Sequence, residues 1–244
     1  MATKEEKWMD RRLGMITASE LGQITSASGK IIDGNVSYIR TKRFERRHGF
    51  GHPVSARAMD IGNEQEPYVI DWVRANIPEL KDIIYSKDLP EIPFWVAEDC
   101  PVGASPDAFT EDERIVVEAK TLVGATAIEF FDDQYTPMEE KKLAVWKDHG
   151  DQILGQFISN KKVETIILVK YIYQDDDIMK DNDSPNAPWR GLVFKFERKD
   201  YEASIEEMRQ RIILFDAMID NPINPSEYKK GEWVVFENGQ LLKQ

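Results

Sequence analysis

The chain has 244 residues, of which 41% are hydrophobic and 31% charged, and its formal net charge is −12. This composition excludes a disordered or fibrous protein, and the length allows a full hydrophobic core. No apolar stretch is long enough to cross a bilayer, and the N-terminal MATKEEKWMDRR lacks the apolar core of a signal peptide. We therefore expect a cytoplasmic protein without membrane contact.

Three helices are predicted in the first third of the chain. The stretch TASELGQIT predicts a short helix with Thr17 or Ser19 as its N-cap. Residues 36–48 predict a second helix. The stretch NEQEPYVIDWVRAN predicts a third helix, which begins near Gly62, tolerates Pro67 in an early turn and then carries apolar residues at helical spacing.

Positive charge is concentrated in this first part, although the net charge is negative. Residues 1–62 hold 11 Lys and Arg against 7 Asp and Glu. Such a run is either a solvated helix face or a surface that attracts DNA, because an acidic protein can bind DNA where its positive charge is concentrated. The densest stretch, YIRTKRFERRHG, contains Arg40, Lys42, Arg43, Arg46, Arg47 and His48.

Short runs of β-branched and aromatic residues predict strands in the middle of the chain. These runs are DIIYSKDL (82–89), FWVAED (94–99) and RIVVEAKTL (114–122). The polar stretch TEDER predicts a turn between the last two. The resulting hairpin would carry Asp107 before the turn and Glu118 after it.

The second half predicts a helix over 145–160, strands over 163–173 and 191–198, and a closing amphipathic helix over 200–220. A loop rich in Asp, Asn and Pro, from Tyr173 to Pro188, separates the two strands. This order predicts an α/β fold, with a central mixed β-sheet flanked by α-helices. We expect one domain over residues 1–244.

The most informative motif lies in SPDAFTEDERIVVEAK. Side chains alternate between the faces of a strand, so Glu118 and Lys120 point the same way. A bare Glu-x-Lys is usually an exposed ion pair. Here, however, Asp107 precedes a short turn, which would bring its carboxylate to Glu118.

Two converging carboxylates repel each other unless a cation lies between them. The single cysteine, Cys100, and the three histidines (His48, His52, His149) form no zinc-ligand spacing, so oxygens would hold the metal. Mg²⁺ fits such a site, and Mn²⁺ is possible. Lys120 could orient or deprotonate the attacking water, the second role requiring a lowered pKa.

The pattern Pro-Asp followed by Glu-x-Lys resembles the PD-(D/E)xK nuclease superfamily. Four stretches, in order and in approximate spacing, resemble the phage lambda exonuclease family, also called the YqaJ-type viral recombinase nucleases. The resemblance covers roughly Trp8 to Phe215 and implies a restriction-endonuclease-like core. The stretches are WMDRRLGMITASE, GNEQEPYVIDW, ASPDAF…VVEAK and GDQILGQFISN.

The resemblance implies catalytic roles for particular residues. Asp107 and Glu118 would bind the metal together with the main-chain carbonyl of Ala119, and Lys120 would be the catalytic lysine. Glu66 would face the metal directly or through a coordinated water. Without the other motifs, Glu66 reads as a glutamate favoured by the dipole at a helix start.

The resemblance also implies a pocket for a terminal phosphate, formed by Arg12, Ser19, Ser105 and Gln152. An arginine fork and hydroxyls beside a helix N-terminus make an anion site. Taken alone, Ser19 is more often a helix cap and Gln152 a polar helix residue. The chain departs from the family pattern at Leu154, where the family has a second glutamine, and at Ala108, where it has glycine.

The function implied is a Mg²⁺-dependent exonuclease that digests duplex DNA from 5′ ends and leaves single-stranded tails for recombination. Residues of about 8–77 would form a helical DNA-end-binding part, and about 199–220 a C-terminal helix. The implied partners are DNA ends, a single-strand annealing protein and further copies in a trimeric ring, in a bacterial host or encoded by a prophage. A structure- or sequence-specific endonuclease, a non-catalytic DNA-end or protein-interaction module, and a protein that binds metal for stability alone remain alternatives.

Overall fold

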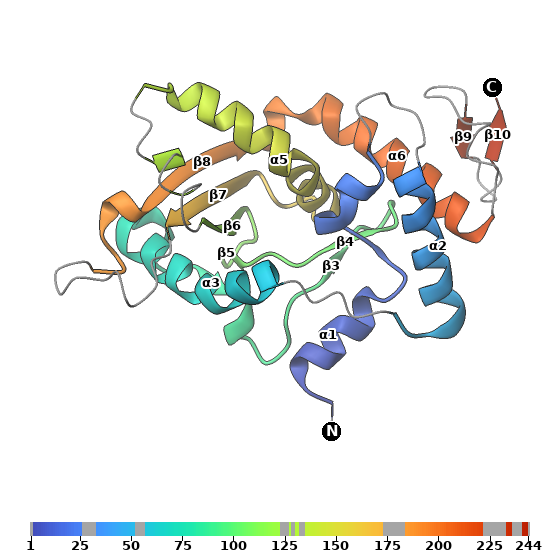
Figure 1. Ribbon diagram of the computed structural model, residues 1–244, viewed down its shortest axis with the longest axis horizontal. Helices are drawn as coiled ribbons and strands as arrows, with labels where there is room; N and C mark the ends of the chain where they lie inside the picture. Colours follow the sequence, from blue (N-terminus) through green and yellow to red (C-terminus); the bar gives the residue numbers. More distant parts are fainter. Residues whose placement is uncertain are drawn as a thin grey trace.

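The computed structural model describes residues 2–25, 33–51, 57–122, 127, 130–131, 135–172, 184–221, 233–235 and 241–243. No helix in these ranges is both long and apolar enough to span a membrane. The long helices, in chain order, are α1 (Lys4–Arg12), α2 (Asp33–His48), α3 (Arg57–Asn76), α5 (Met138–Ser159) and α6 (Glu202–Asp220) (Figure 1).

A five-stranded mixed sheet forms the centre of the molecule. The strand order is β2-β5-β6-β7-β8, in which β6 and β7 are parallel and the other neighbours antiparallel. The α/β fold with a central mixed sheet is therefore confirmed. The strands are β2 (Ile84–Tyr85), β5 (Ala108–Phe109), β6 (Ile115–Leu122), β7 (Thr165–Ile172) and β8 (Gly191–Glu197).

Two small sheets accompany the central one. In the first, β4 (Val102–Ala104) lies between β1 (Ile16–Thr17), to which it is parallel, and β3 (Trp95–Val96), to which it is antiparallel. The second pairs β9 (Trp233–Val235) with β10 (Leu241–Lys243).

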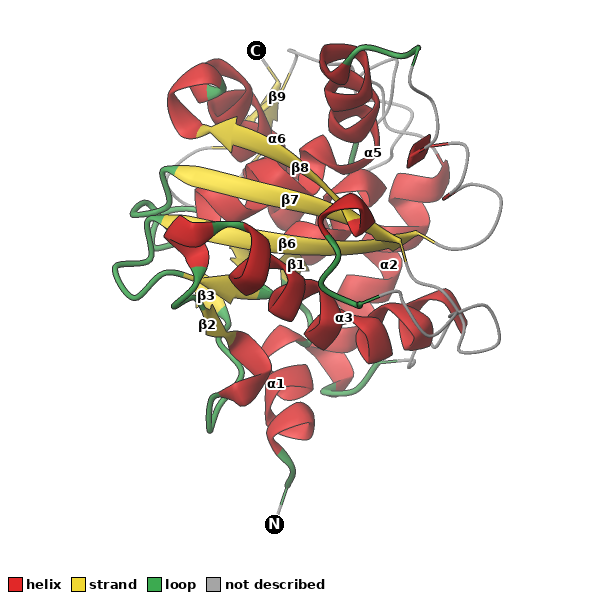
Figure 2. Cartoon of the chain, turned by 90° about the vertical axis from the view of Figure 1, so that its left-hand side faces the viewer, coloured by secondary structure: helices red, strands yellow, loops and turns green. Residues whose placement is uncertain are grey.

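Helices cover both faces of the central sheet (Figure 2). Side chains alternate along β6 and β7, so each strand contributes to two separate cores. The core against α3 includes Val69, Ile70, Val73, Val117, Ile167 and Val169. The larger core, against α5 and α6, includes Val116, Ile153, Phe157, Ile166, Leu168, Phe194, Ile212 and Phe215.

The third predicted helix differs from expectation. It begins at Arg57, earlier than the predicted start near Gly62, and Pro67 lies inside it rather than in an early turn. Pro67 is exposed, whereas Val69, Ile70 and Val73 are buried. Burial of this apolar face outweighs the local cost of proline in a helix.

The predicted strand pairing was also partly wrong. FWVAED contributes β3, which pairs with β4, and the hairpin partner of β6 is the two-residue strand β5. TASELGQIT forms the end of β1 and then a 3-10 helix, Ala18–Gln23, with Thr17 as its N-cap. Residues 173–183 of the predicted loop Tyr173–Pro188 lie outside the described residues.

Candidate active site

The β5–β6 hairpin brings the first carboxylate beside β6, the middle strand of the sheet. Hydrogen bonds between Thr110 and Ile115 close the turn. Within it, Glu113 adopts a left-handed backbone conformation with a positive φ of 62°. Because Ala108 pairs with Val117, the residue before β5 lies beside the middle of β6. Asp107 Oδ2 accepts a hydrogen bond of 2.7 Å from the Ala119 backbone N–H.

This bond also orients the Ala119 carbonyl. The N–H and C=O of one strand residue leave the strand on the same edge, so the Ala119 carbonyl leaves β6 on the side of Asp107. The carbonyl oxygen, Asp107 and Glu118 are therefore gathered at one place on the sheet.

Glu118 is a buried carboxylate with three hydrogen-bond donors. Its side chain is 3% exposed. Lys120 Nζ lies 2.6 Å from Oε1 of Glu118, and Gln152 Nε2 donates to the same oxygen at 2.5 Å. Gln156 Nε2 donates to the other oxygen, Oε2. This arrangement satisfies a charge that would otherwise be costly to bury.

The Lys120 ammonium is held in its charged form. Burial alone lowers the pKa of a lysine, but the charges of Glu118 and Asp107 outweigh burial and raise the pKa of Lys120. Of the two roles considered for Lys120, this arrangement of charges favours orienting the water, because deprotonating it requires a lowered pKa. A lysine with a raised pKa donates hydrogen bonds and orients a bound group, and is a poor base.

The surroundings of Asp107 disfavour its charged form, whereas those of Lys120 favour its charged form. Burial, followed by the charges of Glu118 and Glu66, raises the pKa of Asp107 well above its usual value, although Lys120 and the Ala119 N–H act against this. The carboxylates thus repel one another. A divalent cation among these oxygens would relieve the repulsion.

Glu66 lies close to this site but has its own partners. Its Oε2 is 2.9 Å from Lys87 Nζ, and its charge and hydrogen bond contribute, after burial, to raising the pKa of Tyr85. Within the described ranges, no group of three or more Asp, Glu, His or Cys side chains is arranged to hold a metal. Mg²⁺ needs only one or two carboxylates besides carbonyl, water and phosphate oxygens, so Asp107, Glu118 and the Ala119 carbonyl fit it.

Three of the four predicted phosphate-binding residues are linked through Trp8. The Arg12 guanidinium lies over the Trp8 ring, 4.3 Å from its centroid, and Arg12 Nη2 donates to Ser19 Oγ at 3.3 Å. Trp8 Nε1 donates to Ser105 Oγ at 2.6 Å. Burial lowers the pKa of Arg12, although Glu20 and Tyr38 act against this effect.

The fourth residue, Gln152, bonds Glu118 instead. Its helix nevertheless lies against the element that carries Ser19. A side chain at Gly155 of α5 would meet Leu21 and Ala18 of the 3-10 helix at 2.6 and 2.7 Å. Gln152 is thus placed on the helix that lies between the carboxylates and the Arg12 group.

The sequence interpretation missed three polar residues on this face of the sheet. Gln156 bonds Glu118, and Lys170 of β7 lies 2.7 Å from His149 Nε2 of α5. A signal for the helix residues existed, because His149, Gln152 and Gln156 recur at spacings of three and four and so share one helix face. Lys170 lies within an apolar run, and its pairing with Lys120 is visible only once β6 and β7 are adjacent.

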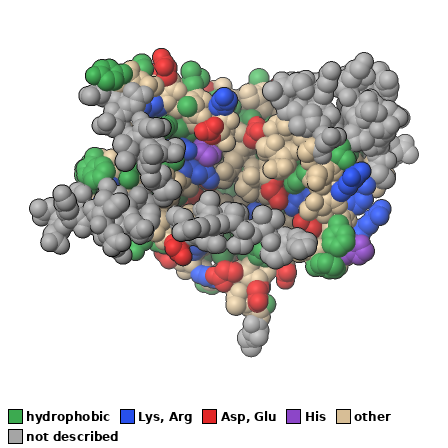
Figure 3. All heavy atoms as spheres, viewed as in Figure 1, with side chains coloured by type: hydrophobic (Ala, Val, Ile, Leu, Met, Phe, Trp, Pro, Cys, Tyr) green, Lys and Arg blue, Asp and Glu red, His purple; other side chains and the backbone are tan. Residues whose placement is uncertain are grey.

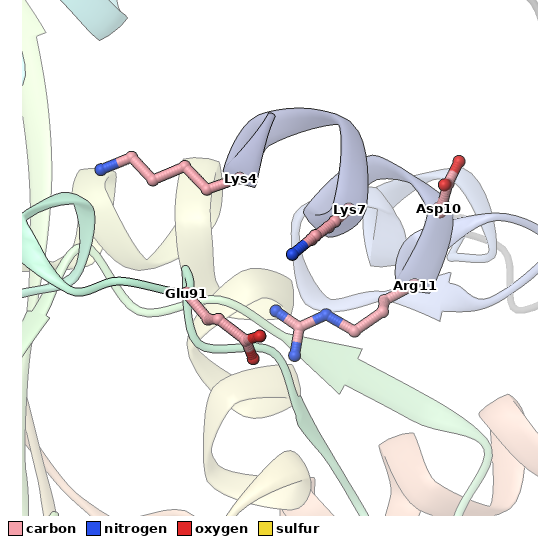
Figure 4. Close-up of a pocket in the computed structure, with 5 residues that line it drawn as sticks. All are labelled: Lys4, Lys7, Asp10, Arg11 and Glu91. Carbon is pink, nitrogen blue, oxygen red and sulfur yellow. The ribbon is translucent and has the colours of Figure 1, made fainter. Parts of the chain in front are cut away.

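A separate surface pocket lies beside α1, away from the carboxylates. In Figure 4 the side chains of Lys7 and Arg11 extend toward Glu91, whereas Asp10 points away. Lys4 and Arg11 also donate to the backbone carbonyls of Lys87 and Ile92. These contacts attach α1 to the segment before β3 and so position Trp8 and Arg12.

Solved structures with the same fold are exonucleases. The chain is 22% identical to an alkaline exonuclease, LHK-Exo, from Laribacter hongkongensis, with a TM-score of 0.61 over 88% of this chain and 92% of that one. LHK-Exo in complex with dAMP gives 21% identity and a TM-score of 0.56 over 88% and 94%. A phage-related exonuclease from Haemophilus somnus 129PT gives 14% and 0.54 over 87% and 98%.

No protein-family model and no curated protein matches the chain. The structural similarity extends over nearly the whole length of each neighbour. The resemblance to the lambda-exonuclease-like proteins is thus confirmed at the level of a restriction-endonuclease-like fold.

Proposed function

We propose that this chain is a metal-dependent deoxyribonuclease, an exonuclease that digests one strand of duplex DNA from the 5′ end and leaves single-stranded tails for phage-type recombination. The observation that carries the proposal is the convergence of Asp107, Glu118 and Lys120 at the middle strand β6 of the sheet. The exonuclease fold of LHK-Exo, which binds dAMP, supports it.

Each group gathered at β6 has a role in phosphodiester hydrolysis. Mg²⁺, or alternatively Mn²⁺, held by Asp107, Glu118 and the Ala119 carbonyl would stabilise negative charge on the phosphate. Lys120, charged at neutral pH, orients the attacking water by donation. Glu66 contributes through a water between its carboxylate and this site, since its own oxygen is paired with Lys87.

The Arg12 group accounts for the choice of a DNA end. Arg12, Ser19 and Ser105 offer a guanidinium and two hydroxyls to a terminal 5′ phosphate, and Trp8 holds Arg12 and Ser105 together. Gln152 bonds the catalytic carboxylate of Glu118, on a helix that packs against the element carrying Ser19. An anchor for a terminal phosphate is useful only to an enzyme that grips an end.

Further parts of the proposal concern partners. By resemblance to the lambda enzyme, the protein acts on double-stranded DNA ends in the cytoplasm of a bacterial host, assembles as a trimeric ring and passes the tail to a single-strand annealing protein. Light scattering tests the ring directly. The expected mass is three times the 28.2 kDa of one chain.

Digestion of end-labelled linear duplexes, with and without a 5′ phosphate, tests the function. We expect Mg²⁺-dependent release of nucleotides that begins at the phosphorylated 5′ end. Lys120→Ala should lose hydrolysis and keep DNA binding. The matched control is Lys162→Ala, because Lys162 is exposed and its ammonium lies 3.2 Å from Glu113 Oε2, outside the site.

Two results would favour the alternatives. Cleavage of a closed circular duplex would indicate an endonuclease on the same core. Unchanged behaviour of Lys120→Ala, together with DNA binding by both proteins, would indicate a non-catalytic DNA-end module.

A further inference from the structure

Lys170 is a buried cation one strand away from Lys120. In the parallel pair β6–β7, Lys120 and Lys170 are direct partners, so their side chains leave the same face of the sheet. That face also carries Glu118 and is covered by α5. Lys170 is 7% exposed. The sequence motifs give it no role.

His149 holds the Lys170 ammonium in position. Lys170 Nζ and His149 Nε2 are 2.7 Å apart. When Lys170 is charged, its ammonium can only donate, so Nε2 accepts and the ring is neutral, with its proton on Nδ1. Burial, with the positive charges of Lys170 and Lys120, lowers the pKa of His149 to about 3. This neutral partner does not balance the charge of Lys170.

The described residues provide Lys170 with no ion pair. Burial, together with the positive charge of Lys120, lowers the pKa of Lys170, and the acidic group that acts against this is the exposed Asp148. The nearby Glu118 is already satisfied by Lys120 and two glutamine amides. A buried charge without a partner is costly, and an anion that enters the site would remove this cost.

We propose that Lys170, positioned by His149, binds a non-bridging phosphate oxygen of the DNA strand, on the phosphate next to the one at Lys120. Paired residues of adjacent strands are about 4.8 Å apart, so the two ammonium groups can serve neighbouring phosphates of one strand. This inference rests on the proposed nuclease function and adds a DNA contact outside the Arg12 group.

Neutral phosphate analogues provide the test. Linear duplexes carry one uncharged methylphosphonate at successive positions from the 5′ end. The wild type should be slowed at the position that Lys170 contacts. Lys170→Met should digest ordinary DNA about tenfold to a hundredfold more slowly, the range expected for one charge-assisted hydrogen bond, and show no further slowing at that position. Lys195→Met, an exposed lysine of the neighbouring strand β8, is the control.

Equal sensitivity of Lys170→Met and wild type at every position would overturn the proposal. Should Lys170→Met not fold, Lys170→Gln takes its place, since it also removes the charge but keeps a polar side chain beside His149, and the same two outcomes apply. Binding without divalent metal separates this inference from the nuclease function. Without divalent metal, the slope of DNA affinity against salt concentration should fall in Lys170→Met by about the equivalent of one phosphate contact, even if no protein hydrolyses DNA. An unchanged slope counts against the Lys170 contact.

Discussion

At the scale of single residues, the site depends on the hydrogen bonds that the buried Glu118 side chain accepts. Its two carboxylate oxygens accept hydrogen bonds from Lys120, Gln152 and Gln156, and Gln156 is 1% exposed. Loss of a donor to a buried charged group is more costly than loss of an ordinary surface hydrogen bond. The two amides are therefore part of the stability of the fold as well as of the site.

Gln156→Leu should lower the free energy of unfolding by about 1–2 kcal/mol, because Glu118 loses its donor at Oε2. The Oε1 atom of Gln156 has no hydrogen-bond partner within the described structure, and its removal offsets part of the loss. Urea denaturation measures the difference. Gln210→Leu, at an exposed amide that bonds Glu206, should change stability by no more than about 0.5 kcal/mol. Greater stability of Gln156→Leu than of wild type would contradict this account.

His149 predicts a pH dependence of stability. Its folded pKa of about 3 lies below the usual value of 6.5, so the unfolded chain binds the extra proton first as the pH falls. The contribution is complete above about pH 6.5 and is lost toward pH 3. Asp107, with a raised pKa, acts in the opposite direction. A comparison with His149→Gln isolates the histidine, since both proteins keep Asp107.

Between pH 7 and pH 4, the stability of the wild type should fall relative to His149→Gln, by on the order of 1 kcal/mol per pH unit below pH 6.5. The expected change in stability per pH unit is kept small because the His149 ring is only partly buried. Denaturant titrations at each pH measure it. Parallel pH profiles for the two proteins would show that His149 is not held neutral.

At the scale of elements, the packing of α5 on the 3-10 helix Ala18–Gln23 depends on Gly155. A Cβ at this position would lie 2.6 Å from Leu21 and 2.8 Å from the backbone of Ala18. Gly155→Ala should therefore destabilise the protein by about 1–3 kcal/mol, despite the better helix propensity of alanine. It should also weaken 5′-phosphate selectivity, because Ser19 lies on the displaced element.

Gly62→Ala in α3 is the matched control. A Cβ there meets no atom within 4 Å, so alanine should stabilise the helix by up to about 1 kcal/mol. Thermal and urea unfolding should therefore show changes in stability of opposite sign for the two variants. The same sign for both would mean that the close contact at Gly155 is relieved by a shift of the two elements.

The hairpin illustrates what the sequence predicts well. The β-branched run over residues 114–122 and the polar turn before it predicted β6, and side-chain alternation along a strand put Glu118 and Lys120 on one face, where their atoms lie 2.6 Å apart. The short strands β3, β4 and β5, of two or three residues each, were not separable by pattern, because pairing rather than local preference defines strands of this length. The Lys170–His149 contact likewise depends on the pairing of β6 with β7, which joins segments distant in the chain.

At the scale of the whole molecule, the basic stretch of α2 proves to be partly internal. Lys42 is buried between Glu20 and Glu45, Arg43 donates to carbonyls at the end of α6, and Arg46 pairs with Asp216 and Asp220. The exposed basic residues of this stretch are Arg40, Arg47 and His48. Figure 3 shows basic, hydrophobic and histidine side chains gathered at the edge over α2. A charge pattern in sequence therefore overstates the positive surface available to DNA.

The repulsion around Asp107 couples metal binding to the stability of the whole chain. An ion that binds only the folded state stabilises it by about 2.7 kcal/mol at a concentration 100 times its dissociation constant. For a chain of this length, 1 kcal/mol shifts Tm by about 2–4 °C. Mg²⁺ at constant ionic strength should therefore raise Tm by several degrees, and by more at higher pH, because the ion must displace a proton that the raised pKa of Asp107 retains.

Asp107→Asn separates this effect from general screening of the net charge of −12. Without Mg²⁺ the variant should be at least as stable as the wild type, because one of the repelling carboxylates is gone, whereas its Mg²⁺-dependent rise in Tm should be lost. Asp82→Asn, at a carboxylate that is 86% exposed, should keep the full rise. Equal shifts in all three proteins would place the ion elsewhere on the acidic surface. A shift lost only in Asp107→Asn would tie the ion to the edge of β6, where Glu118 and Lys120 lie.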